Sequence, residues 1–448
     1  MTRQPTRLTV TLAILALLAG LTAMRVSAQD IPVEEPPPAE LPVPDEQIKE
    51  VADAAQLFGK LQFDAALSKL KEATTKHPEL PPAQLIMATW FARANQAGAV
   101  RAYLELTVKD LPNDPEAYLI LGDINTGERR TTEAGLLYAK AAELVPGVTN
   151  EERKSRLGPR VESGLAAVAA ARQDWATAQK HLEAWLKLDP KSDVAMRRLA
   201  VALFQQRDAK QALEQLKTAY EINPKTLHYG ATMAQFYEQS GDHENAKTWM
   251  EFAMKAAPKA LSTWLVAAQW SLQTGQLAEA EKEAATAMQL DRESIDAKIL
   301  RGVIALFQRD YKSAEIYFES ALLDSPRNFA AKNNLALALC EQSDEAKKRR
   351  ALDYAVENAR LFPKNAEAIS TYGWVLYRAG NVKEADTVLS RLARSGRVSE
   401  DTAYFIARVA AESGRKDEAK AVLEPTLQSK RPFSKRQEAQ TLLDELNR

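Results

Sequence analysis

Prolines recur along most of this chain at a constant interval. Within two runs of three, successive prolines are 34 residues apart, and one more follows at twice that interval: Pro78, Pro112 and Pro146; Pro190, Pro224 and Pro258; then Pro326. Intervals of 20 to 50 residues are typical of solenoids, in which each repeat buries its apolar surface only against its neighbours. The spacing therefore predicts a stack of short units rather than one compact core.

Small residues keep the same register as the prolines. Twelve residues before a proline position, and again five before it, alanine recurs: Ala66 and Ala73, Ala134 and Ala141, Ala212 and Ala219, Ala246 and Ala253, Ala280 and Ala287, Ala314 and Ala321. A bulky residue such as Leu70, Tyr138 or Phe318 lies between each pair. This pattern predicts two amphipathic helices in each unit, joined by turns such as QRD, SGD or TGQ, and ended by the proline.

The units resemble tetratricopeptide repeats. The best matches run from Pro115 to Pro146 and from Ala368 to Leu392, where the first-helix pattern, Gly122 or Gly373, and the second-helix alanine coincide. About eleven such units cover residues 47–431. The resemblance implies an all-α, right-handed superhelical solenoid of helix-turn-helix repeats, in which the first helix of each unit lines the concave surface.

Two insertions and a closing helix complete the predicted organisation. Ten extra residues near GVTNEERKSR and three near SDEAKKRR interrupt the spacing, and we expect both to form surface loops or helix extensions. Residues 432–448 are interpreted as a C-terminal capping helix, because a solenoid end needs a polar outer face. Small residues such as Ala134, Ala246 and Ala314 are expected where helices cross closely.

The first residues are interpreted as an export signal. Arg3 and Arg7 precede an uncharged run from Leu8 to Met24, and Val26-Ser27-Ala28 forms a small-residue cleavage site. We therefore expect a signal peptide over 1–28, a Pro/Glu-rich disordered spacer over 29–46, and an exported protein of the periplasm or cell envelope, or one secreted further. The alternative is a retained single anchor. No cysteine follows the apolar run, which argues against a lipoprotein.

Charge and composition exclude several classes. The chain has 59 basic and 60 acidic residues, so nothing favours a nucleic-acid binder. Its 46% hydrophobic content excludes wholesale disorder, and its single cysteine excludes a disulfide scaffold.

Little in the sequence indicates catalysis. The four histidines, His77, His181, His228 and His243, form no recognisable metal or catalytic motif, and we expect them at turns and on the surface. No phosphate-binding glycine motif is present. Cys340 is expected to be buried as a small apolar residue. We therefore expect no enzyme activity, no catalytic or metal site and no cofactor.

The expected function is to bind a protein or an extended peptide, as a scaffold, in the concave groove. Applying the family's inward-facing positions gives a polar middle and an aromatic, arginine-containing C-terminal part: Gln235, Gln269, Gln273, Phe307, Asn333, Trp374, Tyr377, Arg378, Tyr404 and Arg408. Aromatic residues and arginine dominate interface energetics. The alternative for Trp374 and Tyr377 is packing between neighbouring helices. Competing functions are a self-associating component of an envelope assembly and an enzyme activity carried on the repeats.

Overall fold

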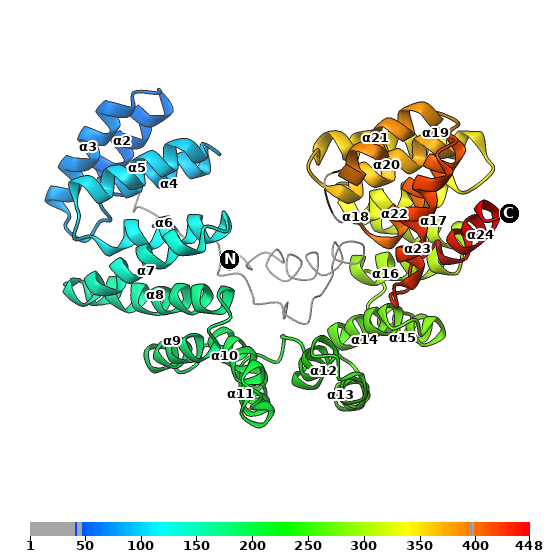
Figure 1. The fold of residues 1–448 in the computed structure, drawn as a ribbon. Coiled ribbons are helices and arrows are strands. Elements are labelled where there is room, and N and C mark those ends of the chain that lie inside the picture. Colours follow the sequence, from blue (N-terminus) through cyan, green and yellow to red (C-terminus); the bar gives the residue numbers. More distant parts are fainter. Residues whose placement is uncertain (1–40, 43–46, 395, 397) are drawn as a thin grey trace. The chain divides into compact units, whose positions relative to one another are not determined.

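A computed structural model describes residues 41–42, 47–394, 396 and 398–448. The predicted signal peptide and most of the predicted spacer lie outside these residues. The described residues form 23 α-helices and one short 3-10 helix, η2 (Val145–Gly147), and contain no strand. The all-α prediction is confirmed. The helices belong to two compact units, Ala28–Thr232 and Met233–Arg448, called here the N-terminal and C-terminal units (Figure 1).

The N-terminal unit is a series of helix pairs. Within each pair the two helices contact each other more extensively than they contact other helices. The pairs are α2 (Lys49–Gly59) with α3 (Phe63–Lys76), α4 (Ala83–Arg93) with α5 (Ala97–Asp110), α6 (Pro115–Gly127) with α7 (Thr131–Leu144), α8 (Glu151–Ala171) with α9 (Trp175–Leu188), and α10 (Asp193–Gln205) with α11 (Ala209–Ile222). The next helix, α12 (Tyr229–Gln239), begins in this unit and ends in the C-terminal unit.

The C-terminal unit continues the same pattern. After α12 comes α13 (His243–Ala256). The pairs that follow are α14 (Leu261–Gln273) with α15 (Leu277–Leu290), α16 (Ile295–Phe307) with α17 (Tyr311–Asp324), α18 (Phe329–Cys340) with α19 (Glu345–Leu361), α20 (Ala366–Arg378) with α21 (Val382–Arg394), and α22 (Glu400–Glu412) with α23 (Lys416–Gln428). A last helix, α24 (Arg436–Leu446), lies beside α22 and α23 (Figure 1).

Small residues allow the close helix crossings. Ala134, Ala246 and Ala314 are fully buried, as predicted. A Cβ atom on Gly302 would lie 2.5 Å from the Phe318 ring, and one on Gly164 would lie 2.5 Å from the Tyr138 ring. Real Cβ atoms do not come so close, so the bulky side chain of one helix fills the space that the missing side chain leaves on an adjacent helix.

The turn within most pairs contains one residue in the left-handed conformation. In the N-terminal unit none of these residues is glycine: Leu61, Asn95, Arg129, Gln173 and Arg207. In the C-terminal unit most are: Gly241, Gly275, Arg309, Gly380 and Gly414. The centres of the predicted QRD, SGD and TGQ turns are among them. Glycine adopts this conformation without strain because it has no Cβ atom. Where another residue lies at this position of the turn, the pairing of the two helices imposes the conformation.

Both insertions extend helices. The ten-residue insertion forms η2 and the first turns of α8, which has 21 residues, whereas its partner α9 has 14. The three-residue insertion lengthens α19 to 17 residues. Of the two outcomes that the sequence left open, the structure therefore shows the helix extension.

Two residues of the predicted spacer lie on the N-terminal unit. Leu41 packs against the hydrophobic cluster of that unit, and the Pro42 carbonyl accepts a hydrogen bond of 2.9 Å from the Thr89 hydroxyl on α4. The chain is thus already in contact with α4 before the first helix pair begins.

Candidate functional site

The residues predicted to line the groove are on the first helices of the C-terminal unit's pairs. We call them, together with Glu341, Glu367 and Asp401 on the same helices or at their ends, the first-helix face. Gln235, Gln269 and Phe307 are half-buried, and Gln273 is exposed. Asn333 is buried, and its Oδ1 has no hydrogen-bond partner among the described residues. Whether these residues bind a partner stays a prediction.

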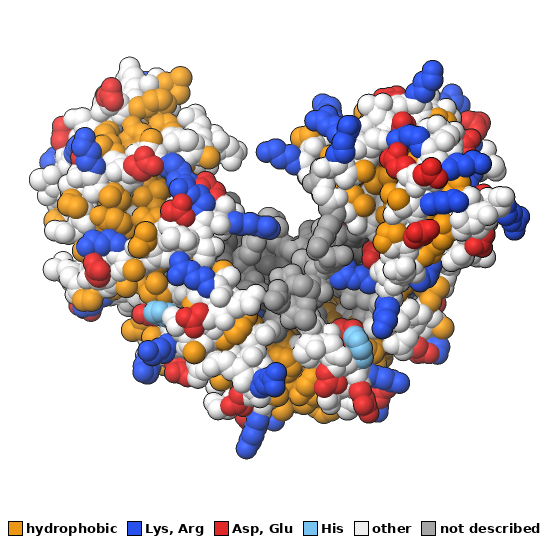
Figure 2. Space-filling view, in the orientation of Figure 1, with side chains coloured by type: hydrophobic (Ala, Val, Ile, Leu, Met, Phe, Trp, Pro, Cys, Tyr) orange, Lys and Arg blue, Asp and Glu red, His pale blue; other side chains and the backbone are white. Residues whose placement is uncertain are grey.

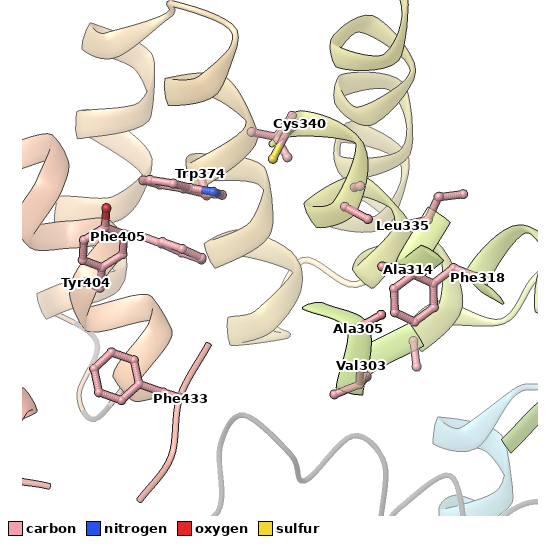
Figure 3. Packing of buried hydrophobic residues seen from close by; sticks show 14 of the residues in the cluster. Val303, Ala305, Ala314, Phe318, Leu335, Cys340, Trp374, Tyr404, Phe405 and Phe433 are labelled. Carbon is pink, nitrogen blue, oxygen red and sulfur yellow. The ribbon is translucent and has the colours of Figure 1, made fainter. Parts of the chain in front are cut away.

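Three aromatic residues of the first-helix face, Trp374, Tyr377 and Tyr404, form a stack with Phe405. Trp374 lies 4.4 Å from Phe405 with nearly parallel rings, and 5.1 Å from Tyr377. Tyr404 contacts Trp374 at 5.6 Å. Trp374 and Tyr404 are only 2% and 6% exposed, so much of the stack is covered rather than open to solvent (Figure 3). Packing between helices, the alternative that the sequence left open for Trp374, describes its surroundings in this structure.

A carboxylate connects this stack to the cations of the first-helix face. Glu341, which follows the last residue of α18, accepts a hydrogen bond of 2.9 Å from the Trp374 indole nitrogen and pairs with Arg378 at 3.4 Å. Arg408 donates to the Tyr377 hydroxyl at 3.0 Å. The structure therefore brings together Trp374, Tyr377, Arg378, Tyr404 and Arg408, whereas the described bonds of this network do not include Gln235 or Gln273.

The chain's own end lies on this network. We call residues 429–448 the C-terminal segment. Its Lys435 pairs with Glu341 at 2.8 Å and donates to the Tyr311 hydroxyl at 3.0 Å. Although burial disfavours its charge, Glu341 raises the pKa of Lys435 above its ordinary value. The segment predicted as a terminal cap thus contacts residues of much earlier repeats.

Two further acids occupy the second position of their helices. Asp401 in α22 accepts backbone hydrogen bonds from Ser434 and Lys435, and burial raises its pKa. Glu367 in α20 lies 34 residues earlier and has a buried Oε1 without a hydrogen-bond partner among the described residues. Burial raises the pKa of Glu367 to about 7.

Sequence reasoning missed Glu341, Asp401 and Lys435. A signal was present for Asp401, because Glu367 precedes it by one repeat length. No signal was present for Lys435, because its partners lie as far as 124 residues away in the sequence.

The expectation for the histidines is wrong at one position. His228 is 4% exposed and lies 5.1 Å from Tyr220, ring to ring, and burial lowers its pKa. His77 and His243 each pair with a nearby glutamate at the surface. Cys340 is fully buried, as predicted, and burial raises the pKa of its thiol.

The described part of the chain shows neither a metal-binding cluster nor a membrane-spanning helix. Its histidine, cysteine and acidic side chains form no group of three able to hold a metal ion. None of the helices in these same ranges is long and apolar enough to span a bilayer. Figure 2 shows basic and acidic side chains interspersed over the visible surface of each unit.

The described residues thus form a helical repeat solenoid, a class of protein that typically serves as a non-catalytic scaffold. Models of the tetratricopeptide repeat match residues 91–148, 169–236, 231–259 and 299–366. The chain belongs to the tetratricopeptide repeat family, whose members generally mediate protein–protein interactions.

Several solved structures resemble this chain at low sequence identity. No curated protein matches the sequence. Among solved structures, yeast Tom70 is 16% identical, with 89% of this chain and 95% of that chain covered and a TM-score of 0.37. The APC/C hetero-tetramer Cut9–Hcn1 is 12% identical, with 88% of this chain and 95% of that chain covered and a TM-score of 0.43. A tetratricopeptide repeat protein from Parabacteroides merdae is also 12% identical, with 65% of this chain and 99% of that chain covered and a TM-score of 0.36.

Proposed function

We propose that this protein is an exported scaffold that binds a partner protein through the first-helix face of its C-terminal unit. One observation carries the proposal: this face already holds a non-helical stretch of polypeptide. Asp401 accepts two backbone N–H groups of the C-terminal segment, and Glu341 accepts a side-chain ammonium from it. Side-chain acceptors for a backbone, beside an aromatic stack, are what recognition of an extended peptide requires.

The face is tested by photo-cross-linking in cells. A photoreactive amino acid replaces Gln273, which is exposed at the end of α14, and in a matched strain it replaces Gln289, which is exposed on the paired helix α15. We expect a cross-linked partner protein from position 273 and none from position 289. Equal adducts from both positions would remove the assignment to the first-helix face.

Export is proposed from the sequence pattern of residues 1–28. The protein should be recovered from the envelope or periplasmic fraction, and mass spectrometry of its N-terminal peptide should give Gln29 as the first residue. Recovery of a chain that starts at Met1 in the cytoplasmic fraction would overturn the localisation.

A further inference from the structure

The C-terminal segment is attached to the solenoid by apolar and polar contacts. Residues 429–435 are not helical, and α24 buries only Ala439 and Leu442. Phe433 is 6% exposed and belongs to the same hydrophobic cluster as Trp374 and Tyr404 (Figure 3). Its apolar anchoring on the other helices therefore combines this ring with Ala439 and Leu442 of α24, which belong to the same cluster.

The polar contacts of the C-terminal segment are numerous, and they are made by residues 429–438. Besides the bonds of Lys435 and of the backbone to Asp401, the Ser434 hydroxyl donates to Asp401 at 3.0 Å, and the Ser429 hydroxyl donates to Glu400 at 2.8 Å. Further along, Glu438 pairs with Arg309 at 3.3 Å. The stretch thus reaches from α22 to the turn between α16 and α17.

Charge is complementary between the two surfaces. Residues 429–436 read SKRPFSKR, with four basic residues and no acid. Glu341 receives the Lys435 ammonium, whereas the neighbouring acids Glu400 and Asp401 accept hydrogen bonds from serine hydroxyls and from the backbone of the same stretch. A buried lysine held by a carboxylate is favourable only with good geometry, and Lys435 has it, with a carboxylate at 2.8 Å and a phenol at 3.0 Å.

The C-terminal segment does not satisfy the whole face. Buried acceptors on two first helices, Glu367 Oε1 and Asn333 Oδ1, have no hydrogen-bond partner in the described ranges. A buried polar group without a hydrogen-bond partner destabilises the folded state.

We propose that residues 429–438 are an internal pseudo-ligand of the first-helix face, and that the partner is a basic, extended protein segment with an aromatic residue followed two positions later by lysine, which displaces it. This inference rests on the proposed function and deepens it. The C-terminal segment keeps the face covered until a segment of the same chemistry replaces Phe433 and Lys435 in their sites.

The test uses a fluorescent peptide with the sequence of residues 429–440, SKRPFSKRQEAQ, and full-length protein. Fluorescence anisotropy measures the affinity of this peptide for the wild type and for the double variant Phe433→Ala/Lys435→Ala. In this weakened variant the C-terminal segment binds the face less tightly, and the residues of the face are unchanged. We expect the weakened variant to bind the peptide at least tenfold more tightly. Adding Asp401→Asn to this variant should lower the peptide affinity at least tenfold. A peptide in which the residues equivalent to Phe433 and Lys435 are both alanine should not bind.

Either of two results overturns the proposal: equal affinity of the wild type and the weakened variant, or no binding by a variant that circular dichroism shows to be folded. If that variant does not fold, hydrogen exchange of the wild type decides. Amides of residues 436–448 should then exchange at least tenfold faster than those of α20 and α22, and faster still with excess peptide. Exchange as slow as in α20 would show a permanent part of the fold.

Failure here is distinguishable from failure of the proposed function. If the C-terminal segment is permanent, the cross-link from position 273 is still expected to form. If the cross-link is absent but the peptide exchanges, the face binds only its own chain end and the proposed function falls.

Discussion

The N-terminal and C-terminal units both place an acid at the second position of a first helix, and they neutralise it differently. In the N-terminal unit, Glu116 of α6 is fully buried and pairs with Arg153 at 2.8 Å and Arg156 at 2.7 Å, both from the extension of α8. In the C-terminal unit, Asp401 receives its hydrogen bonds from the C-terminal segment, and Glu367 has an acceptor that receives none from the described residues.

The difference shows how one repeat position can serve two purposes. An insertion between two repeats supplies the arginines of the N-terminal unit, so the pairing is fixed by helices packed on both sides. The C-terminal segment supplies the donors in the C-terminal unit, and its helix α24 lies outside the helix pairs of the solenoid. Buried acids in the first case are paired within the stack, and in the second they hold the segment that we propose to be exchanged for a ligand.

The largest expected effect is in the N-terminal unit. Arg153→Ala/Arg156→Ala leaves Glu116 buried without a cation, and breaking a buried ion pair by removing one partner costs about 3–5 kcal/mol. Chemical denaturation should show this loss of unfolding free energy, and adding Glu116→Gln should restore part of it. Arg101→Ala, which breaks an exposed pair with Glu128, is the control and should cost under about 1 kcal/mol. Equal losses would show that Glu116 does not depend on its arginines.

A smaller effect is expected from Glu367. Its pKa is about 7 in the folded protein and 4.5 in the unfolded chain, so unfolding free energy is lost as the pH rises from 4.5 through 7. At 1.36 kcal/mol for each pKa unit the loss is about 3 kcal/mol. Glu367→Gln should therefore be more stable than the wild type at pH 8 and equal to it near pH 4, as measured by urea denaturation across that range. A pH-independent difference would contradict the assigned pKa.

The smallest effect concerns the turns. Leu61 has φ of 61° and is 72% exposed, whereas Gly380 has φ of 86° and no atom within 4 Å of an added Cβ. Leu61→Gly should stabilise the protein by about 1 kcal/mol because it removes backbone strain, and Gly380→Ala should destabilise it by about the same amount. Thermal unfolding midpoints check both. Shifts of the same sign would refute a common left-handed turn.

Much of the fold followed from the sequence because the repeat is a local pattern. Ala134, Ala246 and Ala314 are buried as predicted because the 34-residue spacing places small residues at the same helix crossing each time. The site was less predictable. Spacing identified the helices that carry Trp374 and Arg408, but burial of Trp374 depends on α22 and on Glu341, which the repeat pattern does not specify. Contacts of Lys435 are not periodic, so no repeat analysis could find them.

The C-terminal segment is covalently linked to α23, and this link raises the affinity that a competing partner would need. A ligand tethered by a short flexible linker has an effective concentration in the millimolar range. If the segment is exchanged as proposed, a free partner at micromolar concentration must bind the face roughly a thousandfold more tightly than the detached segment would, in order to occupy half of the molecules. A partner that presents several copies of its segment, or is anchored nearby, would meet that threshold with ordinary affinity.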